Sequence, residues 1–253
     1  MEIEKISHKD VESLRSSLIA AKLKPSTIND YRNIINAICN YAIKTDIYDG
    51  KNPTKYFEKL KVDNRREKFL TKSEILDLLE SVKSDATLLL FTKLSLSVGG
   101  RMGTVLNIKK RDVDLENEII TLKNVKSNKT YNGYITDSEL TDLLKNRMKS
   151  IGNNDFLIGK EGVKNAERYI RKKMKVIYDE LFNYDLDPND VNYNKYKVVN
   201  HTLRHTFCST LGMKGVSPFE IQTLSNHSNL SSVMWYVKLS PQFSKDKVNG
   251  LYD

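Results

Sequence analysis

Three of the chain's four histidines fall between positions 201 and 236. His201, Arg204 and His205 follow one another at i, i+3 and i+4, so a helix there presents all three on one face. His227 comes next, in a short polar break, and Tyr236 follows it. Imidazole, guanidinium and phenol groups gathered in one short stretch indicate a chemical site.

Several familiar sites do not fit these residues. No G-x-S-x-G turn is present, which argues against a serine hydrolase. His201 and His205 have the i, i+4 spacing of a zinc pair, but Arg204 lies between them and the glutamate of H-E-x-x-H is missing. The chain also has neither a phosphate-binding P-loop nor a dinucleotide glycine pattern.

A phosphodiester fits this set of groups. Arginines clamp the non-bridging oxygens of a phosphate and stabilise the charge that develops in the transition state. A phenol has an ordinary pKa near 10, so its attack on phosphorus at neutral pH needs such help. A lysine or histidine near the leaving oxygen would supply the proton, and the product would be a phosphotyrosine.

The stretch also resembles a known family. Residues 201–207 read HTLRHTF and look like the H-x-L-R-H-T-F box of the tyrosine recombinases, the phage-integrase and Xer family. Residues 224–230, LSNHSNL, followed by Tyr236, resemble that family's second box. Upstream, SVGGR at 97–101 takes the place of its T-G-x-R.

This resemblance implies a role for each matching residue. Arg101 and Arg204 would grip the scissile phosphate, and Tyr236 would be the nucleophile. His201 and His227 would bond the phosphate oxygens and help in proton transfer.

The family's general acid is a lysine in a β-hairpin after the first arginine. Lys126 fits that place best, and Lys129 is the competitor. Three positions depart from the family: Thr104 replaces an acidic residue, Gly100 an apolar one, and Asn226 a glycine. Asn tolerates the left-handed backbone that a helix end requires there, so we expect the last change to be mild.

The elements expected around these residues are mainly α-helices with one small antiparallel three-stranded β-sheet. The resemblance divides the chain into a short, truncated helical core-binding domain at 1–60 and a catalytic domain at 69–253. Residues 61–68 between them are basic with little apolar content, which indicates a linker or an exposed helix end. In the first domain, apolar spacing predicts helices over Lys9–Ala21, from a cap at Ser26, and over Pro53–Leu60.

Capping boxes predict further helix starts at Thr71, Thr136 and Ser217, each with glutamate three residues later. Two longer helices are expected over Ala86–Val98 and Asn165–Leu181. The expected strands are Val113–Leu115, Ile119–Leu122 and Tyr134–Thr136.

The chain carries a formal charge of +9, with a pI near 9.3. Such an excess of cations favours polyanionic partners such as DNA, although a basic helix is also compatible with a merely solvated face. The expected DNA contacts are Lys24, Arg32, Lys129, Arg168 and Lys172.

No apolar run is long enough to span a bilayer, no secretion signal opens the sequence, and Cys39 and Cys208 lie far apart. We therefore expect a cytoplasmic protein with reduced cysteines and no membrane partner.

The sequence thus predicts a site-specific recombinase or integrase that cleaves and rejoins DNA through a 3′-phosphotyrosine, without metal or other cofactor. The expected partners are double-stranded DNA with a recombination site and further subunits in a homo- or heterotetramer, with Val237–Asp253 as a docking segment. A type IB topoisomerase-like relaxing enzyme and a catalytically silent DNA-binding relative are the alternatives. Phage integration, element mobility and chromosome-dimer resolution all use such a site and stay open.

Overall fold

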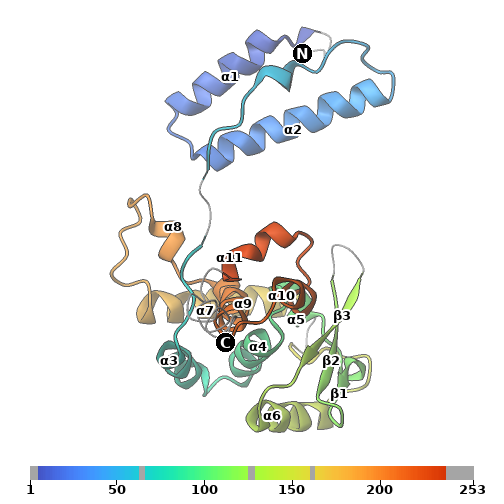
Figure 1. The fold of residues 1–253 in the computed structure, drawn as a ribbon, viewed down its shortest axis with the longest axis vertical. Coiled ribbons are helices and arrows are strands. Elements are labelled where there is room, and N and C mark those ends of the chain that lie inside the picture. The colour runs from blue at the N-terminus through green and yellow to red at the C-terminus, as the bar shows by residue number, and fades with distance from the viewer. Residues whose placement is uncertain (1–4, 63–65, 125–128, 160–162, 238–253) are drawn as a thin grey trace, which may run out of the picture. The chain divides into compact units, whose positions relative to one another are not determined.

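The computed structural model describes residues 5–62, 66–124, 129–159 and 163–237. The chain divides into two compact units, residues 1–65 and 66–253, and each unit is described by itself. Figure 1 traces the elements of both. Among the described helices, none combines the length and apolar character needed to cross a membrane.

The first unit is a pair of helices closed by a short turn. Helix α1 spans His8–Ala20, α2 spans Pro25–Lys44 and the 3-10 helix η2 spans Pro53–Tyr56. Val11, Ile28 and Phe57, one from each part, form its small core. Two expectations are corrected here. Proline at the first position starts α2 after Lys24, so Ser26 is not the cap, and η2 ends well before Leu60.

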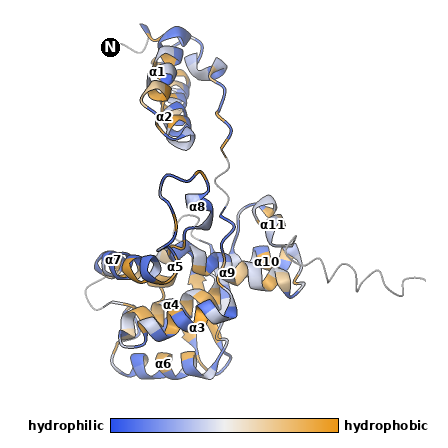
Figure 2. Ribbon diagram, turned by 90° about the vertical axis from the view of Figure 1, so that its left-hand side faces the viewer, coloured by the Kyte–Doolittle hydropathy of each residue, from blue (hydrophilic) through white to orange (hydrophobic). Residues whose placement is uncertain are grey.

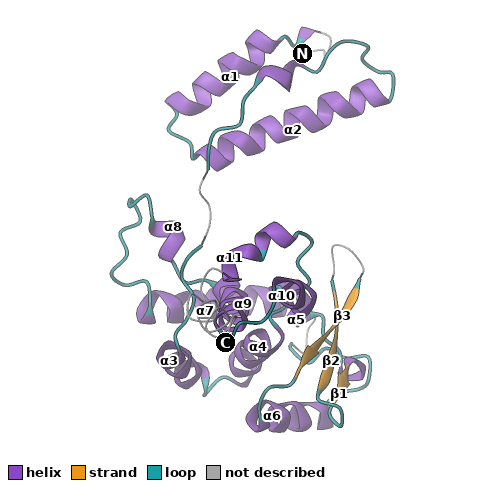
Figure 3. Cartoon of the chain, viewed as in Figure 1, coloured by secondary structure: helices purple, strands orange, loops and turns teal. Residues whose placement is uncertain are grey.

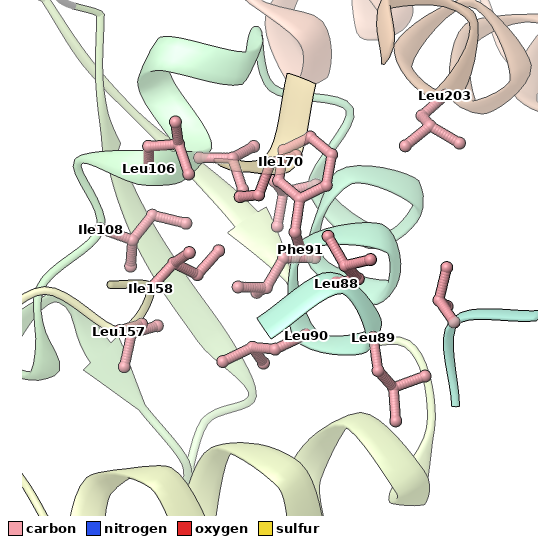
Figure 4. Packing of buried hydrophobic residues seen from close by; sticks show 14 of the residues in the cluster. Leu88, Leu89, Leu90, Phe91, Leu106, Ile108, Leu157, Ile158, Ile170 and Leu203 are labelled. Atoms are coloured by element: carbon pink, nitrogen blue, oxygen red, sulfur yellow. The ribbon is translucent and has the colours of Figure 1, made fainter. Parts of the chain in front are cut away.

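The second unit is built around a helix that is apolar on nearly all sides. Helix α4, Ala86–Val98, is capped by Asp85 and buries most of its residues. Figure 4 shows Leu88, Leu90 and Phe91 of α4 in the central cluster, which extends to Ile170 and Leu203. A helix hydrophobic all round is expected at the centre of a unit of this size.

The helices around α4 begin close to where the sequence predicts. Helix α3, Lys72–Val82, starts with the capping box of Thr71 and Glu74, and α10, Pro218–Ser225, with that of Ser217 and Glu220. Helix α6, Ser138–Lys149, is capped by Asp137 instead of Thr136, because the Asp137 carboxylate accepts the Leu140 N–H. The remaining helical segments are α5 (Met102–Leu106), η3 (Lys110–Asp112), α7 (Val163–Leu181), α8 (Tyr193–Tyr196), α9 (Asn200–Met213), η4 (Leu230–Ser232) and α11 (Met234–Val237).

A three-stranded antiparallel sheet, in the order β1-β2-β3, lies beside these helices (Figure 3). Strand β1 is Val113–Asp114, β2 is Ile119–Lys123 and β3 is Thr130–Tyr134. The fold class is therefore confirmed, but the third strand lies before the expected Tyr134–Thr136. Asn132 and Gly133 have low strand propensity, yet Gly133 pairs with Ile120. Its missing side chain is what lets Val98 of α4 approach, since a Cβ there would lie 2.7 Å from Val98.

Residues 66–68, expected in the linker, lie with the second unit. The Arg66 guanidinium donates to the carbonyl of Lys197, the Glu67 N–H donates to the carbonyl of Lys195, and Lys195 and Glu67 form an ion pair. These contacts bring Arg66 close to the start of α9.

Candidate active site

Helix α9 carries the histidine and arginine cluster on one face. Figure 1 shows it in the middle of the second unit, where it packs against α4, α10 and α11. Arg204 is only 2% exposed, and its Nη1 donates to the carbonyl of Gly99 over 2.8 Å. Its Nη2 is buried and has no hydrogen-bond partner among the described residues. A buried guanidinium with a free donor is poised for an anion with more than one oxygen.

The carbonyl that holds Arg204 belongs to a left-handed helix end. Gly99 ends α4 at a φ of 57°, and a Cβ there would lie 2.1 Å from the ring of Phe207. Only glycine combines this backbone with so close a neighbour. The turn at 99–100 therefore orients Arg204 and also leads the chain directly into Arg101.

Tyr236 lies in α11, which packs directly on α9. A Cβ at Gly212 would be 2.1 Å from the carbonyl oxygen of Tyr236, so α11 touches α9 where α9 has no side chain. Cys208, Ile221, Val233 and Tyr236 form a small apolar cluster of their own. Tyr236 is 7% exposed in this cluster.

The hydroxyl of Tyr236 lies 3.1 Å from Nδ1 of His205, within hydrogen-bond distance. Burial raises the pKa of the Tyr236 phenol, with a further rise from Cys208 and an opposing effect from the charge of Arg204. Burial also lowers the pKa of His205. A neutral imidazole thus lies within hydrogen-bond distance of a protonated phenol, which is the geometry that proton transfer to His205 needs, while both pKa shifts oppose the transfer.

His227 also lies near the tyrosine, with its ring centroid 6.1 Å from that of Tyr236. Asn226, with a φ of 50°, ends α10 in the left-handed conformation anticipated from the sequence. Ser225 Oγ then lies 2.6 Å from Nδ1 of His227. Burial, followed by the charges of Arg204 and Arg101, lowers the pKa of His227 to about 3.

His201 opens the same face of α9. The residue is exposed as a whole, but loss of water around the ring and the charges of Arg204 and Arg66 lower its pKa to about 4. Both His201 and His227 are therefore neutral at pH 7. The positive charge of the site comes from its arginines.

Arg101 is half-buried at the start of α5. Its charge, like that of Arg204, lowers the pKa of His227. Tyr131 of β3 lies beside the two arginines, because its hydroxyl is 3.6 Å from where a Cβ of Gly100 would stand. Burial raises the pKa of Tyr131, and the charges of Arg204 and Arg101 oppose that rise. Thr104 is buried behind Arg101, and its N–H donates to the Arg101 carbonyl.

The candidate lysines are placed unequally. Lys126 lies outside the described residues. Lys129 is exposed at the start of β3, where its carbonyl accepts the N–H of Asn124. The choice of general acid between them stays a prediction.

The residues expected to contact DNA fall into two groups. Lys24 is exposed, as are Arg168 and Lys172, which lie one turn apart on α7. Figure 2 shows that α7 carries both hydrophilic and hydrophobic residues along its length. Arg32 differs, because its Nε donates to the carbonyl of Phe57 over 2.8 Å, inside the first unit.

Three residues of the site were missed as participants by sequence reasoning: His205, Tyr131 and Arg66. His205 does stand in the box that names the family, so its position was the available signal. Tyr131 and Arg66 carry no such signal, because long-range packing alone brings them to α9. In the described part of the chain, no group of three His, Cys, Asp or Glu side chains is arranged to hold a metal ion.

Residues 68–242 match the model of the phage integrase family. The chain is similar to a tyrosine recombinase of Pseudothermotoga lettingae, with 28% identity over 256 residues that cover 99% of this chain and 84% of the relative. It is 23% identical to the integrase of Escherichia phage P2, covering 90% of this chain but only 59% of that protein.

Solved structures share the fold. The integrase of transposon Tn1549 in complex with a circular intermediate DNA has a TM-score of 0.67 at 19% identity, covering 92% of this chain and 82% of that one. A lambda integrase tetramer bound to a Holliday junction has a TM-score of 0.64 at 18% identity, covering 90% of this chain and 66% of that one.

Proposed function

Since the chain belongs to the phage integrase family, it is a tyrosine recombinase that cleaves and rejoins DNA, and we propose that Tyr236 forms the covalent link. The observation that carries this assignment is the position of Tyr236. Its hydroxyl lies within hydrogen-bond distance of His205, the residue that follows Arg204 in α9. The Nη2 group of Arg204 is buried and unpaired among the described residues. This family membership favours recombination over a topoisomerase-like relaxing activity and over a catalytically silent relative.

The proposed first step breaks one phosphodiester bond. Oη of Tyr236 attacks phosphorus and gives its proton to His205, while the P–O5′ bond breaks. Arg204 and Arg101 bind the non-bridging oxygens and stabilise the charge that develops there. The leaving 5′ oxygen takes a proton from Lys126, or from Lys129 in its place.

The neutral histidines suit this scheme. His201 and His227 can each donate an N–H to a phosphate oxygen without being charged, and an anion bound there would raise the pKa of both. The 3′-phosphotyrosine keeps the energy of the broken bond, so a 5′ hydroxyl can reverse the step to rejoin the strand. No residue role in this scheme calls for a metal ion or nucleotide cofactor.

We propose double-stranded DNA with a specific recombination site as the substrate and a tetramer as the working assembly. Support comes from relatives named integrase and from the lambda integrase tetramer that shares this fold. The segment after α11, which lies outside the described residues, is the proposed contact with a neighbouring subunit. The proposed compartment is the cytoplasm, which suits two free cysteines and a DNA substrate.

A suicide substrate tests the nucleophile. DNA nicked close to the cleavage site loses a short fragment after attack, so the covalent adduct accumulates and can be counted on a denaturing gel. We expect Tyr236→Phe to bind the DNA with unchanged affinity and to give no adduct. An adduct formed by Tyr236→Phe would show that another residue attacks phosphorus.

A further inference from the structure

A hollow of the second unit lies between α7 and the segment that leads into α9. Its volume is about 340 Å³, far more than a single water molecule needs. Tyr178 lines it from α7, and Lys197, Asn200 and His201 line it from the other wall. Because His201 belongs to the active site as well, the hollow adjoins the proposed position of the scissile phosphate.

Cations surround this hollow. Arg171 and Lys175 line it from α7, and Lys197 lines it opposite them. Arg171 bonds Glu167, and Lys175 lies 2.7 Å from Asp179, whose carboxylate also lines the hollow. These pairs are exposed and therefore weak, so both side chains can turn to a stronger anion.

Two polar side chains at the hollow each have a buried oxygen without a hydrogen bond among the described residues. Tyr178 is 2% exposed, and its hydroxyl is buried without a hydrogen bond. Burial raises its pKa, so the hydroxyl keeps its proton and remains a donor. The Asn200 amide also has a buried, unpaired oxygen, and its NH2 group donates only to the sulfur of Met102 over 3.7 Å. A half-turn of that amide would exchange this weak contact for a donor at the hollow. Buried polar groups without partners are costly, which indicates a ligand that supplies the partner.

The start of α9 faces the same place. Asn200 and His201 are the first two residues of this 14-residue helix. The first N–H groups of a helix have no intrahelical partner, and the helix dipole favours an anion there. Helix end, cations and an unpaired hydroxyl together match a tetrahedral oxyanion.

We propose that this hollow is a second phosphoryl-binding subsite, beside the place of the scissile phosphate. The phosphoryl group belongs either to a neighbouring phosphodiester of the bound DNA strand or to a free nucleotide. The volume accommodates more than a bare phosphate, as both sources require. This proposal rests on the proposed function only in placing the scissile phosphate next to the hollow. The ligand of the hollow itself is bound and not cleaved.

Removing the Tyr178 hydroxyl gives two readouts of opposite sign. In Tyr178→Phe the full chain loses a costly unpaired group, so its thermal midpoint without ligand stays the same or rises. Its affinity for the probe that fills the hollow, one of the two named below, falls about tenfold. This is the effect expected for a lost hydrogen bond to a charged group. Tyr184→Phe, at a residue 78% exposed and outside the hollow, is the control and changes neither value.

The probes are deoxyadenosine monophosphate and a 30-base-pair duplex of arbitrary sequence, each measured by calorimetry over a range of salt. Lys197→Gln is compared with Lys145→Gln, an exposed charge on α6. If a DNA phosphate fills the subsite, Lys197→Gln lowers the salt slope of duplex binding by about 1 and Lys145→Gln does not.

If a free nucleotide fills the subsite, Lys197→Gln and Tyr178→Phe both weaken binding of the monophosphate and leave the duplex slope unchanged. Both results support a phosphoryl subsite and tell its two sources apart. Unchanged binding of both probes in Tyr178→Phe and Lys197→Gln overturns the proposal. None of these measurements depends on cleavage, so failure of the Tyr236 assignment would be seen separately.

Discussion

Single residues around Tyr236 set the charge of the site. Arg204 and Arg101 supply positive charge, and the histidines stay neutral because burial and these arginines lower their pKa values. A site that is cationic through arginine keeps its charge over the whole physiological pH range, because guanidinium does not lose its proton there. In the proposed mechanism, proton transfer is left to groups that can change their protonation state, His205 among them.

Tyr131 is the residue whose contribution is easiest to isolate. Burial keeps its hydroxyl protonated beside Arg204 and Arg101, so it can donate to the same phosphate or hold Arg204 in place. We expect Tyr131→Phe to slow cleavage of the suicide substrate by roughly 10- to 100-fold, as for one lost hydrogen bond to a charged group. DNA affinity should change little.

Tyr134→Phe is the matched control, since Tyr134 lies on the same strand and is 48% exposed. It should cleave at the rate of the unaltered protein. Equal rates for Tyr131→Phe and Tyr134→Phe would exclude Tyr131 from the reaction.

The neutral histidines also predict how stability depends on pH. A histidine whose folded pKa lies below its unfolded value of about 6.5 binds a proton more readily when unfolded. Its contribution to stability is complete above pH 6.5 and is lost as pH falls to about 4 for His201 and about 3 for His227. Urea unfolding at pH 7, 5 and 4 should therefore show a falling free energy of unfolding.

His227→Gln should reduce that fall, because glutamine does not titrate. The comparison is between slopes against pH, so a uniform loss of stability in the variant does not affect it. A slope identical to that of the unaltered protein would mean that His227 is not held neutral.

At the scale of elements, the site depends on how closely α11 packs on α9. Gly212 permits that contact, and Gly99 permits the equally close approach of α4 to Phe207 of α9. Neither glycine has a side chain that could take part in the reaction, yet both set where Tyr236 and Arg204 stand. A shift of about 1 Å at such a contact can slow a reaction 100-fold.

Gly212→Ala tests this packing. Its new methyl group would meet the backbone of Tyr236, so α11 must move. We expect at least a tenfold loss of adduct formation and about 1–3 kcal/mol of destabilisation, as for other overpacked contacts. Gel assay and urea unfolding would measure the two effects.

Gly103→Ala is the control for a helical glycine, because nothing lies within 4 Å of its added Cβ. It should keep full activity and gain up to about 1 kcal/mol from helix propensity. If Gly212→Ala behaved in the same way, α11 would not need its observed position for cleavage.

At the scale of the molecule, each unit has a core of its own. The large cluster around α4 draws all its buried members from residues 70–203, and the small core of the first unit draws on residues 11–57. The groups proposed to act on the phosphate all come from the second unit. We therefore expect the chemistry and the folding of this unit to be separable from the first.

A fragment of residues 66–253 should fold alone and form the covalent adduct, but with weaker DNA binding, because it lacks the cations of the first unit. Circular dichroism and thermal unfolding would check the fold, and the suicide substrate the chemistry. A fragment that folds and binds DNA but gives no adduct would show that the first unit contributes to the reaction itself.

The sequence by itself determined the features that depend on neighbouring residues. The spacing of His201, Arg204 and His205 predicted that a helix there would present all three on one face, and the Ser217 capping box predicted the start of α10. Asn226 predicted the left-handed end before His227. Each is decided by hydrogen bonds and side chains within a few positions, so a short stretch contains all the information.

Only the tertiary structure decided which distant groups meet. Packing makes His205 the partner of the Tyr236 hydroxyl and brings Tyr131 beside the arginines. Packing also brings Arg66, expected in the linker, close to the start of α9. The predicted position of the third strand was wrong for the same reason. Gly133 has low strand propensity, but its lack of a side chain permits the contact with Val98. Such contacts depend on the shapes of several elements at once, and no local pattern records them.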